Sequence, residues 1–190
     1  MKDIPDGATI MVGGFAGAGG MPSQLLVALR KLGTKDLTII ANTAGLGAGY
    51  NAPPGESFLD ITILVENGQV KKAIASFPVS GSPSRPTAFE KLYGEGKVEL
   101  ELVPQGTLAE RIRAGGAGIG GFFTPTGVGT LIARGKEHRV IDGQEYIFEK
   151  PLRADYALIK GHRADTYGNL TYRMTSRNFN AVMALAADIV

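Results

Sequence analysis

Short apolar runs that stop at glycine or polar residues alternate along the chain with stretches in which apolar residues recur every three or four positions. The runs are rich in β-branched side chains, which is typical of buried strands. The recurring positions are typical of amphipathic helices. We predict strands over residues 8–12, 37–41, 73–77, 98–102 and 156–159, and helices over 22–32, 87–93, 107–113 and 179–187.

The order of these elements predicts the fold class. Strand, helix, strand units of this length form right-handed crossovers between parallel strands. We therefore expect a single α/β domain over residues 1–190, with a mostly parallel open sheet flanked by helices. Asp142-Gly143 lies between two short apolar runs and predicts a β-hairpin in the C-terminal third, because this pair suits a two-residue turn. Residues 188–190 have the composition of the opening of a further strand.

Local signals predict where the helices begin and end. Pro22 suits a first helical turn, and Gly33 suits the end of the same helix. Thr107 and Glu110 have the spacing of a capping box, which predicts a helix start at Thr107.

Composition narrows the function. The formal net charge is +2, without a long basic run, so neither nucleic acid nor a membrane surface is an expected partner. No apolar stretch reaches the roughly 18 residues that a membrane span needs. The chain has no cysteine and only two histidines, which disfavours metal sites and nucleophilic triads and fits a cytoplasmic location. We expect a small-molecule substrate and no bound metal.

A glycine-rich segment follows the first predicted strand and precedes the first predicted helix. We call residues 13–20 the glycine loop; it contains five of the chain's 27 glycines. In parallel α/β proteins this place binds anions or polarised oxygens, because backbone N–H groups point at the ligand. The spacing matches neither the dinucleotide fingerprint nor a P-loop. A tight turn needed only for packing is the alternative.

Polar amides follow two other predicted strands. Asn42-Thr43 and Pro104-Gln105-Gly106 should meet the glycine loop at the carboxyl edge of the sheet. An amide can orient a carbonyl or a carboxylate without titrating, as acyl transfer requires. Each could also be an ordinary turn residue.

Other candidates have simpler interpretations. Gly116, Gly118 and Gly121 have the G-x-G-x-x-G spacing but follow a helix, so we interpret them as a structural loop. For His138 and His162 we favour surface or hydrogen-bonded roles. Arg173 and Arg177 could pair with a carboxylate of a ligand or within the fold.

Glu66, beside Asn67-Gly68, is a candidate nucleophile. A glutamate can attack an acyl group. However, Glu66-Asn67-Gly68 ends a helix-like run just before a strand, so we interpret it as a helix stop.

Several short segments, spread along the chain, together form a recognisable pattern. They are Val12-Gly13-Gly14-Phe15 with Gly17 and Pro22, the Pro104-Gln105-Gly106 to Arg113 stretch, Phe123-Thr124-Pro125-Thr126-Gly127, Leu152-Arg153-Ala154-Asp155, Gly168-Asn169-Leu170 and Arg177-Asn178-Phe179-Asn180. Together they resemble the A (alpha) subunit of family I 3-oxoacid coenzyme A transferases over nearly the whole chain.

The resemblance implies a shared active site in a hetero-oligomer of A (alpha) and B (beta) subunits. In that family the nucleophile that attacks the acyl-CoA is a glutamate of the B subunit, so none is expected here, and coenzyme A is a substrate and not a permanent cofactor. The resemblance assigns CoA and acyl binding to Gly13, Gly14, Phe15, Ala16, Gly17, Ala18 and Gly19, and supporting roles to Asn42 and Gln105. Thr43 stands where many relatives have a second Asn.

The resemblance leaves two alternatives for the acyl substrate. Residues 75–78 look like 3-oxoadipate transferases, whereas residues 152–155 and 184–189 look closer to acetate/acetoacetate types. Relatives also extend past both ends, so we expect a trimmed chain. Two further hypotheses remain: a self-sufficient transferase with Glu66 as nucleophile, and a nucleotide-binding or regulatory module without chemistry.

Overall fold

The computed structural model describes residues 3–15, 19–47, 59–82 and 84–190. Its helices are α1 (Ser23–Leu32), α2 (Thr62–Glu66), α3 (Ala88–Gly94), α4 (Gln105–Gly116) and α5 (Asn178–Met183). Its strands are β1 (Thr9–Val12), β2 (Leu37–Thr43), β3 (Val70–Phe77), β4 (Glu99–Leu102), β5 (Phe122–Thr124), β6 (His138–Ile141), β7 (Gln144–Glu149), β8 (Ala154–Leu158), β9 (Arg163–Ala164), β10 (Leu170–Thr171) and β11 (Ala187–Ile189).

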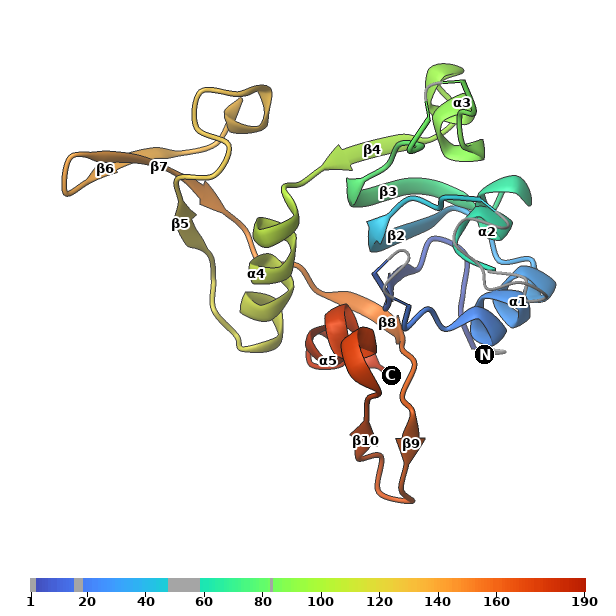
Figure 1. The fold of residues 1–190 in the computed structure, drawn as a ribbon. Coiled ribbons are helices and arrows are strands. Elements are labelled where there is room, and N and C mark those ends of the chain that lie inside the picture. The colour runs from blue at the N-terminus through green and yellow to red at the C-terminus, as the bar shows by residue number, and fades with distance from the viewer. Residues whose placement is uncertain (1–2, 16–18, 48–58, 83) are drawn as a thin grey trace.

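A six-stranded sheet forms the centre of the molecule (Figure 1). Its strand order is β11-β8-β1-β2-β3-β4, and all of its pairings are parallel. The predicted α/β class with a mostly parallel sheet is therefore confirmed. Strand β1 lies inside the sheet between β2 and β8, so the loop that follows it emerges from the middle of the carboxyl edge.

Helices cover both faces of this sheet. Side chains of β2 alternate between the faces: Ile39 packs in a cluster with residues of α1, α2 and α3, whereas Ile40 packs with residues of α4 and α5. This alternation is the geometry of a β-strand, in which neighbouring side chains point to opposite faces. Sheets of parallel strands are commonly buried in this way, which explains the continuous apolar runs in the sequence.

A smaller antiparallel sheet projects from the central one (Figure 1). Its order is β5-β7-β6, and the β6–β7 turn places Asp142 at φ 50° and Gly143 at φ 80°. Two successive positive φ values are those of a type I′ turn, so the hairpin predicted from Asp-Gly is confirmed. Strand β5 and the short β9–β10 hairpin were not among the predicted elements.

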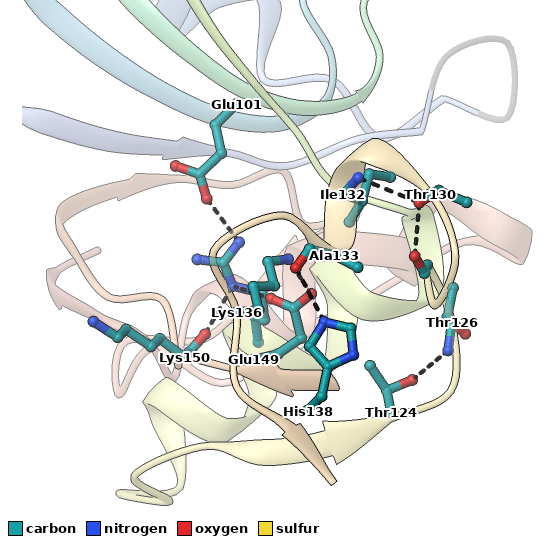
Figure 2. Close-up of polar contacts among 12 residues, drawn as sticks. Glu101, Thr124, Thr126, Thr130, Ile132, Ala133, Lys136, His138, Glu149 and Lys150 are labelled. Carbon is teal, nitrogen blue, oxygen red and sulfur yellow. Dashed lines mark hydrogen bonds and ion pairs between the residues drawn. The ribbon is translucent and has the colours of Figure 1, made fainter. Parts of the chain in front are cut away.

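Ionic contacts join this projecting sheet to α4 and β4 (Figure 2). Arg111 of α4 is buried; it donates to Glu101 Oε1 of β4 at 2.8 Å and to the carbonyl of Lys150 at 2.7 Å. Glu149 of β7 is 2% exposed, lies 3.8 Å from Arg111 Nε and 2.5 Å from Lys136 Nζ. A buried charge is tolerated only with partners of this kind. The network therefore fixes the position of the projecting sheet against α4 and β4.

Glu101 also contacts Lys72 of β3 at 2.9 Å. Burial alone would raise the pKa of this carboxyl, but hydrogen bonds and charge from Arg111 and Lys72 outweigh it and hold the pKa below the ordinary glutamate value.

The predicted start of the helix at Thr107 is wrong, because a proline sets the start of this helix. Helix α4 begins at Gln105, directly after Pro104, so Thr107 lies inside its first turn and does not cap it. The capping box is at Thr87 and Glu90 instead, with Glu90 N–H donating to Thr87 Oγ1 at 3.1 Å and Thr87 N–H donating to Glu90 Oε2 at 2.7 Å.

The last predicted helix is shorter than expected. Helix α5 ends at Met183, and β11 begins at Ala187 because it pairs with β8 at Ala154. The strand suggested by residues 188–190 is therefore present, one residue earlier. Helix α1 begins at Ser23, so Pro22 precedes its first turn. Within the described ranges, no helix combines the length and apolarity needed to cross a membrane.

Candidate functional site

The glycine loop leaves the carboxyl end of β1 in the middle of the sheet. Gly13 N–H donates to the carbonyl of Leu158 in β8 at 2.9 Å, and Phe15 N–H donates to the carbonyl of Gly19 at 3.1 Å. Gly14 has φ 111°, a conformation that favours glycine. Ala16, Gly17 and Ala18 were also predicted to bind CoA, and they lie outside the described residues. The two described flanks of the loop are therefore hydrogen-bonded to each other and to β8.

Asn180 holds both flanks of this loop from the other end of the chain. Its side chain is fully buried; Nδ2 donates to the carbonyls of Gly20 at 3.0 Å and Ser176 at 2.9 Å, and Oδ1 accepts from Lys160 N–H at 2.8 Å. A Cβ on Gly13 would lie 1.9 Å from Asn180 Oδ1, so only glycine fits there. The loop is thus shaped by an asparagine from α5.

Asn178 adds a second amide that binds the C-terminal flank of the glycine loop. Its Nδ2 donates to the carbonyl of Gly19 and to the carbonyl of Thr175, both at 3.0 Å. Sequence reasoning assigned no role to Asn178 or Asn180, although both belong to the Arg177-Asn178-Phe179-Asn180 segment that carries the resemblance. The match of that segment to the family was the signal in the sequence that indicated these two residues.

Phe15 and Gln105 line one pocket, as predicted from their places after β1 and β4. The ring of Phe15 stacks on Phe179 of α5 at 6.1 Å between centroids, and Gln105 is the first residue of α4. The pocket has a volume of about 280 Å³ and is lined by Phe15, Gln105, Ala109, Asn178, Phe179 and Val182. An apolar pocket with two amides can hold an uncharged chain and orient a carbonyl within it.

Asn42 lies at the carboxyl end of β2, buried at 6% exposure. It shares a sheet face with Ile40, the face that α4 and α5 cover, and its neighbour on β3 is Ser76. Within the described ranges, Asn42 Oδ1 and Ser76 Oγ are the buried side-chain atoms without a hydrogen-bond partner. Buried polar atoms are normally paired, so an unpaired couple at the edge where ligands bind is a feature of a binding site.

Glu66 lies far from this edge. It is the last residue of α2, is exposed, and precedes the start of β3, whose amino end is at the opposite edge of the sheet. Its neighbour Asn67 is occupied at that edge, with Nδ2 donating to Gln69 Oε1 at 3.0 Å. The structural interpretation of Glu66 as a helix stop agrees with this position.

The second glycine segment packs against its neighbours. A Cβ on Gly116 would lie 2.9 Å from Leu185, and one on Gly121 would lie 2.2 Å from the ring of Phe148. Gly118 has open space around it and a φ of 70°, so the first and last glycines serve close packing and the middle one a turn, in agreement with the interpretation as a structural loop.

The histidines and arginines occupy different surroundings. His138 Nδ1 contacts Glu145 at 2.7 Å on the surface, and this hydrogen bond raises the pKa of His138. His162 and Arg173 line a second cavity beside Gly20, whereas Arg177 ends the short 3-10 turn before α5. In the described part of the chain, no group of three or more His, Asp or Glu side chains is placed to bind a metal ion.

A known family and several of its members match almost the whole chain. The family model described as "Coenzyme A transferase" matches residues 1–190. The chain is 52% identical over 187 residues to the A subunit of 3-oxoadipate CoA-transferase from Pseudomonas putida, covering 98% of this chain and 75% of that one. It is 50% identical over 186 residues to the alpha subunit of acetate CoA-transferase from Escherichia coli K12, covering 97% and 76%.

Solved structures share the fold at lower identity. Glutaconate coenzyme A-transferase from Acidaminococcus fermentans superposes with a TM-score of 0.74 at 18% identity, covering 100% of this chain and 64% of that one. An acyl-CoA transferase from Escherichia coli O157:H7, solved as a thioester complex with CoA, gives a TM-score of 0.75 at 24% identity, covering 98% and 39%.

Proposed function

The chain belongs to the coenzyme A transferase family, and on that premise we propose that it is the A subunit of a transferase that moves CoA from an acyl-CoA, such as succinyl-CoA, to a 3-oxoacid. The acceptor is 3-oxoadipate or acetoacetate. The observation that supports this most is the meeting of Phe15 and Gln105 in one pocket, with buried unpaired Asn42 at the same sheet edge. A cytoplasmic location is part of the proposal.

The reaction needs a nucleophile, and the described residues that line the Phe15 pocket include no carboxylate. In the proposed complex the B subunit supplies a carboxylate that attacks the thioester carbonyl, which forms an acyl anhydride and releases CoA thiolate. The thiolate then attacks the anhydride at the enzyme's carbonyl, which frees the carboxylic acid and leaves CoA on the enzyme as a thioester. The acceptor acid reverses these two steps. CoA is therefore a substrate of the complex.

In this scheme the A subunit binds and orients the reacting acyl group. Backbone N–H groups of the glycine loop other than those of Gly13 and Phe15, which donate within the fold, stabilise negative charge that develops on the thioester oxygen, in the manner of an oxyanion hole. The amides of Asn42 and Gln105 hold a carbonyl or a carboxylate at the sheet edge, since an amide both donates and accepts. Asn180 acts through the loop by fixing its flanks, so it is a positioning residue.

The two other hypotheses are less well supported. Glu66 as nucleophile would have to act from the opposite edge of the sheet. A nucleotide-binding module without chemistry would have to share 52% identity over 187 residues with part of a transferase and yet lack its activity.

The proposal is tested by mixing the purified chain with a B subunit from the same organism. CoA transfer from succinyl-CoA to acetoacetate and to 3-oxoadipate is followed, with each chain alone as a control. Activity only in the mixture supports the shared site, and the preferred acceptor identifies the substrate. Activity of this chain alone, or tight binding of NAD or ATP without any response to the B subunit, would overturn the proposal.

Variants locate the site within the active mixture. Gln105→Ala should lower the turnover number at least about tenfold, because a transition-state hydrogen bond is lost. Gln144→Ala is the matched control, since Gln144 is exposed at the start of β7 in the projecting hairpin. Equal activity of the two variants would remove Gln105 from the site.

A further inference from the structure

A second cavity, separate from the Phe15 pocket, lies beside the C-terminal flank of the glycine loop. It has a volume of about 450 Å³ and is lined by Gly20, Lys160, Gly161, His162 and the Arg173–Ser176 turn. Gly20 belongs to the glycine loop, so this cavity opens directly beside the segment that we propose to bind the acyl thioester.

The cavity lining carries two basic side chains, those of Lys160 and Arg173, beside the imidazole of His162. These residues come from two separate segments, the connection between β8 and β9 and the turn before α5. In the described ranges no ion pair joins any of these three side chains to a carboxylate. Cationic groups that converge without a counter-charge are typical of a site that binds an anion.

The carboxylate nearest to His162 in the sequence is already occupied. Asp165 Oδ1 accepts from Tyr167 N–H and Asn169 N–H, each at 2.9 Å, and Oδ2 accepts from Asn169 Nδ2 at 2.7 Å. These bonds build the β9–β10 turn and lower the pKa of Asp165. Asp165 is therefore engaged in the β9–β10 turn, and within the described ranges it forms no ion pair with Lys160, His162 or Arg173.

The turn that carries Arg173 is held in an uncommon conformation. Met174 has φ 51° and is 87% exposed, and Ser176 Oγ donates to the carbonyl of Arg173 at 2.5 Å. A positive φ at a non-glycine residue stores strain, and such strain gathers at ligand sites. Packing of the Met174 side chain does not account for this conformation, because the side chain is exposed.

We propose that this cavity binds the second carboxylate of a dicarboxylic acyl group, such as that of 3-oxoadipate or succinate, while the other end of the acid reacts at the glycine loop. Arg173 supplies the planar pair of donors that fits a carboxylate, and Lys160 adds a point charge. Gly20 belongs to both the glycine loop and the cavity lining, so the two ends of a short diacid can lie at adjoining positions. The CoA phosphates, by contrast, are separated from the sulfur by the whole pantetheine arm.

This inference rests on the proposed function, and its test uses the complex with the B subunit. The KM values of 3-oxoadipate and acetoacetate are compared at saturating succinyl-CoA, and the KM values of succinate and acetoacetyl-CoA are measured in the reverse direction. Arg173→Gln should raise the KM of the two diacids about tenfold, because a charged hydrogen bond is lost. The KM of acetoacetate and of acetoacetyl-CoA should change by less than about twofold.

Three further variants complete the experiment. Arg173→Lys should recover part of the affinity for diacids, and Lys160→Gln should reproduce the effect of Arg173→Gln. Arg163→Gln is the matched control, because Arg163 is an exposed arginine on β9 outside the cavity lining. Circular dichroism and association with the B subunit check that each variant is folded.

The outcomes are distinct. A selective rise in the diacid KM supports the assignment. An equal rise in the KM of acetoacetyl-CoA would overturn it in favour of the CoA phosphates, and unchanged KM values for all four substrates would overturn it altogether. An unmutated complex that is inert with every substrate pair would refute the proposed function and, with it, this inference.

Discussion

Replacing Asn180 by alanine should destabilise the fold and disable the glycine loop together. The side chain is fully buried, and its amide joins Lys160 N–H, the Gly20 carbonyl and the Ser176 carbonyl. Leaving a buried group unpaired costs about 1–3 kcal/mol. Because some of these groups can reach water after the change, we expect a total loss of about 2–5 kcal/mol in the free energy of unfolding.

Urea denaturation followed by circular dichroism measures this loss, and the transferase assay with the B subunit measures the effect on the site. Asn67→Ala is the matched control: Asn67 also donates from Nδ2 to two acceptors, but it is exposed and lies at the opposite edge of the sheet. The control should lose less than about 1 kcal/mol and keep its activity. Equal losses for the two variants would refute the argument that Asn180 organises the loop.

Three further variants test other parts of the structure. Gly13→Ala should cost about 1–3 kcal/mol in unfolding free energy, because its Cβ would lie 1.9 Å from a buried amide oxygen, whereas Gly94→Ala, with open space around it, should be neutral or stabilising by the same urea measurement. Arg111→Met should cost about 1–3 kcal/mol, since Glu101 and the buried Glu149 each lose this partner and keep only Lys72 and Lys136; Arg113→Met, on the exposed side of the same helix, should leave the free energy of unfolding nearly unchanged, and similar costs would contradict a structural role for the network. Glu101→Gln should be destabilising at neutral pH, and its difference from the unmodified chain should shrink as the pH falls below 4.5, because the lowered pKa of Glu101 stabilises the fold only while the carboxylate is charged. A constant difference across unfolding curves from pH 7 to pH 3 would contradict that last expectation.

The parts of the fold that were predictable are those with short-range signals. Buried parallel strands appear as apolar runs, and Asp142-Gly143 specifies its own turn. The true capping box at Thr87 and Glu90 also has a local signal, which competed with the same spacing at Thr107 and Glu110. Thr107 does not cap a helix, because α4 begins at Gln105, directly after Pro104.

The site was predictable only in part. Residues that follow parallel strands lie at one edge of the sheet, so sequence order predicted that the glycine loop, Asn42 and Gln105 lie close together. Their binding roles came from the resemblance and stay predictions. Asn180 contacts Gly20 across 160 residues, and no local pattern announces such a contact. The insertion of β8 between β1 and β11 has the same origin, because strand order in a sheet depends on long-range packing.

The place of β1 inside the sheet also has a consequence for synthesis of the chain on the ribosome. Thr9 N–H of β1 donates to Asp155 of β8, a partner 146 residues further along. At about 5–20 residues per second, one edge of β1 stays unpaired for roughly 7–30 s after it is made. An unpaired strand edge is a template for association with other chains. Nascent chains of this protein should therefore depend on chaperones during that interval, until β8 closes the sheet.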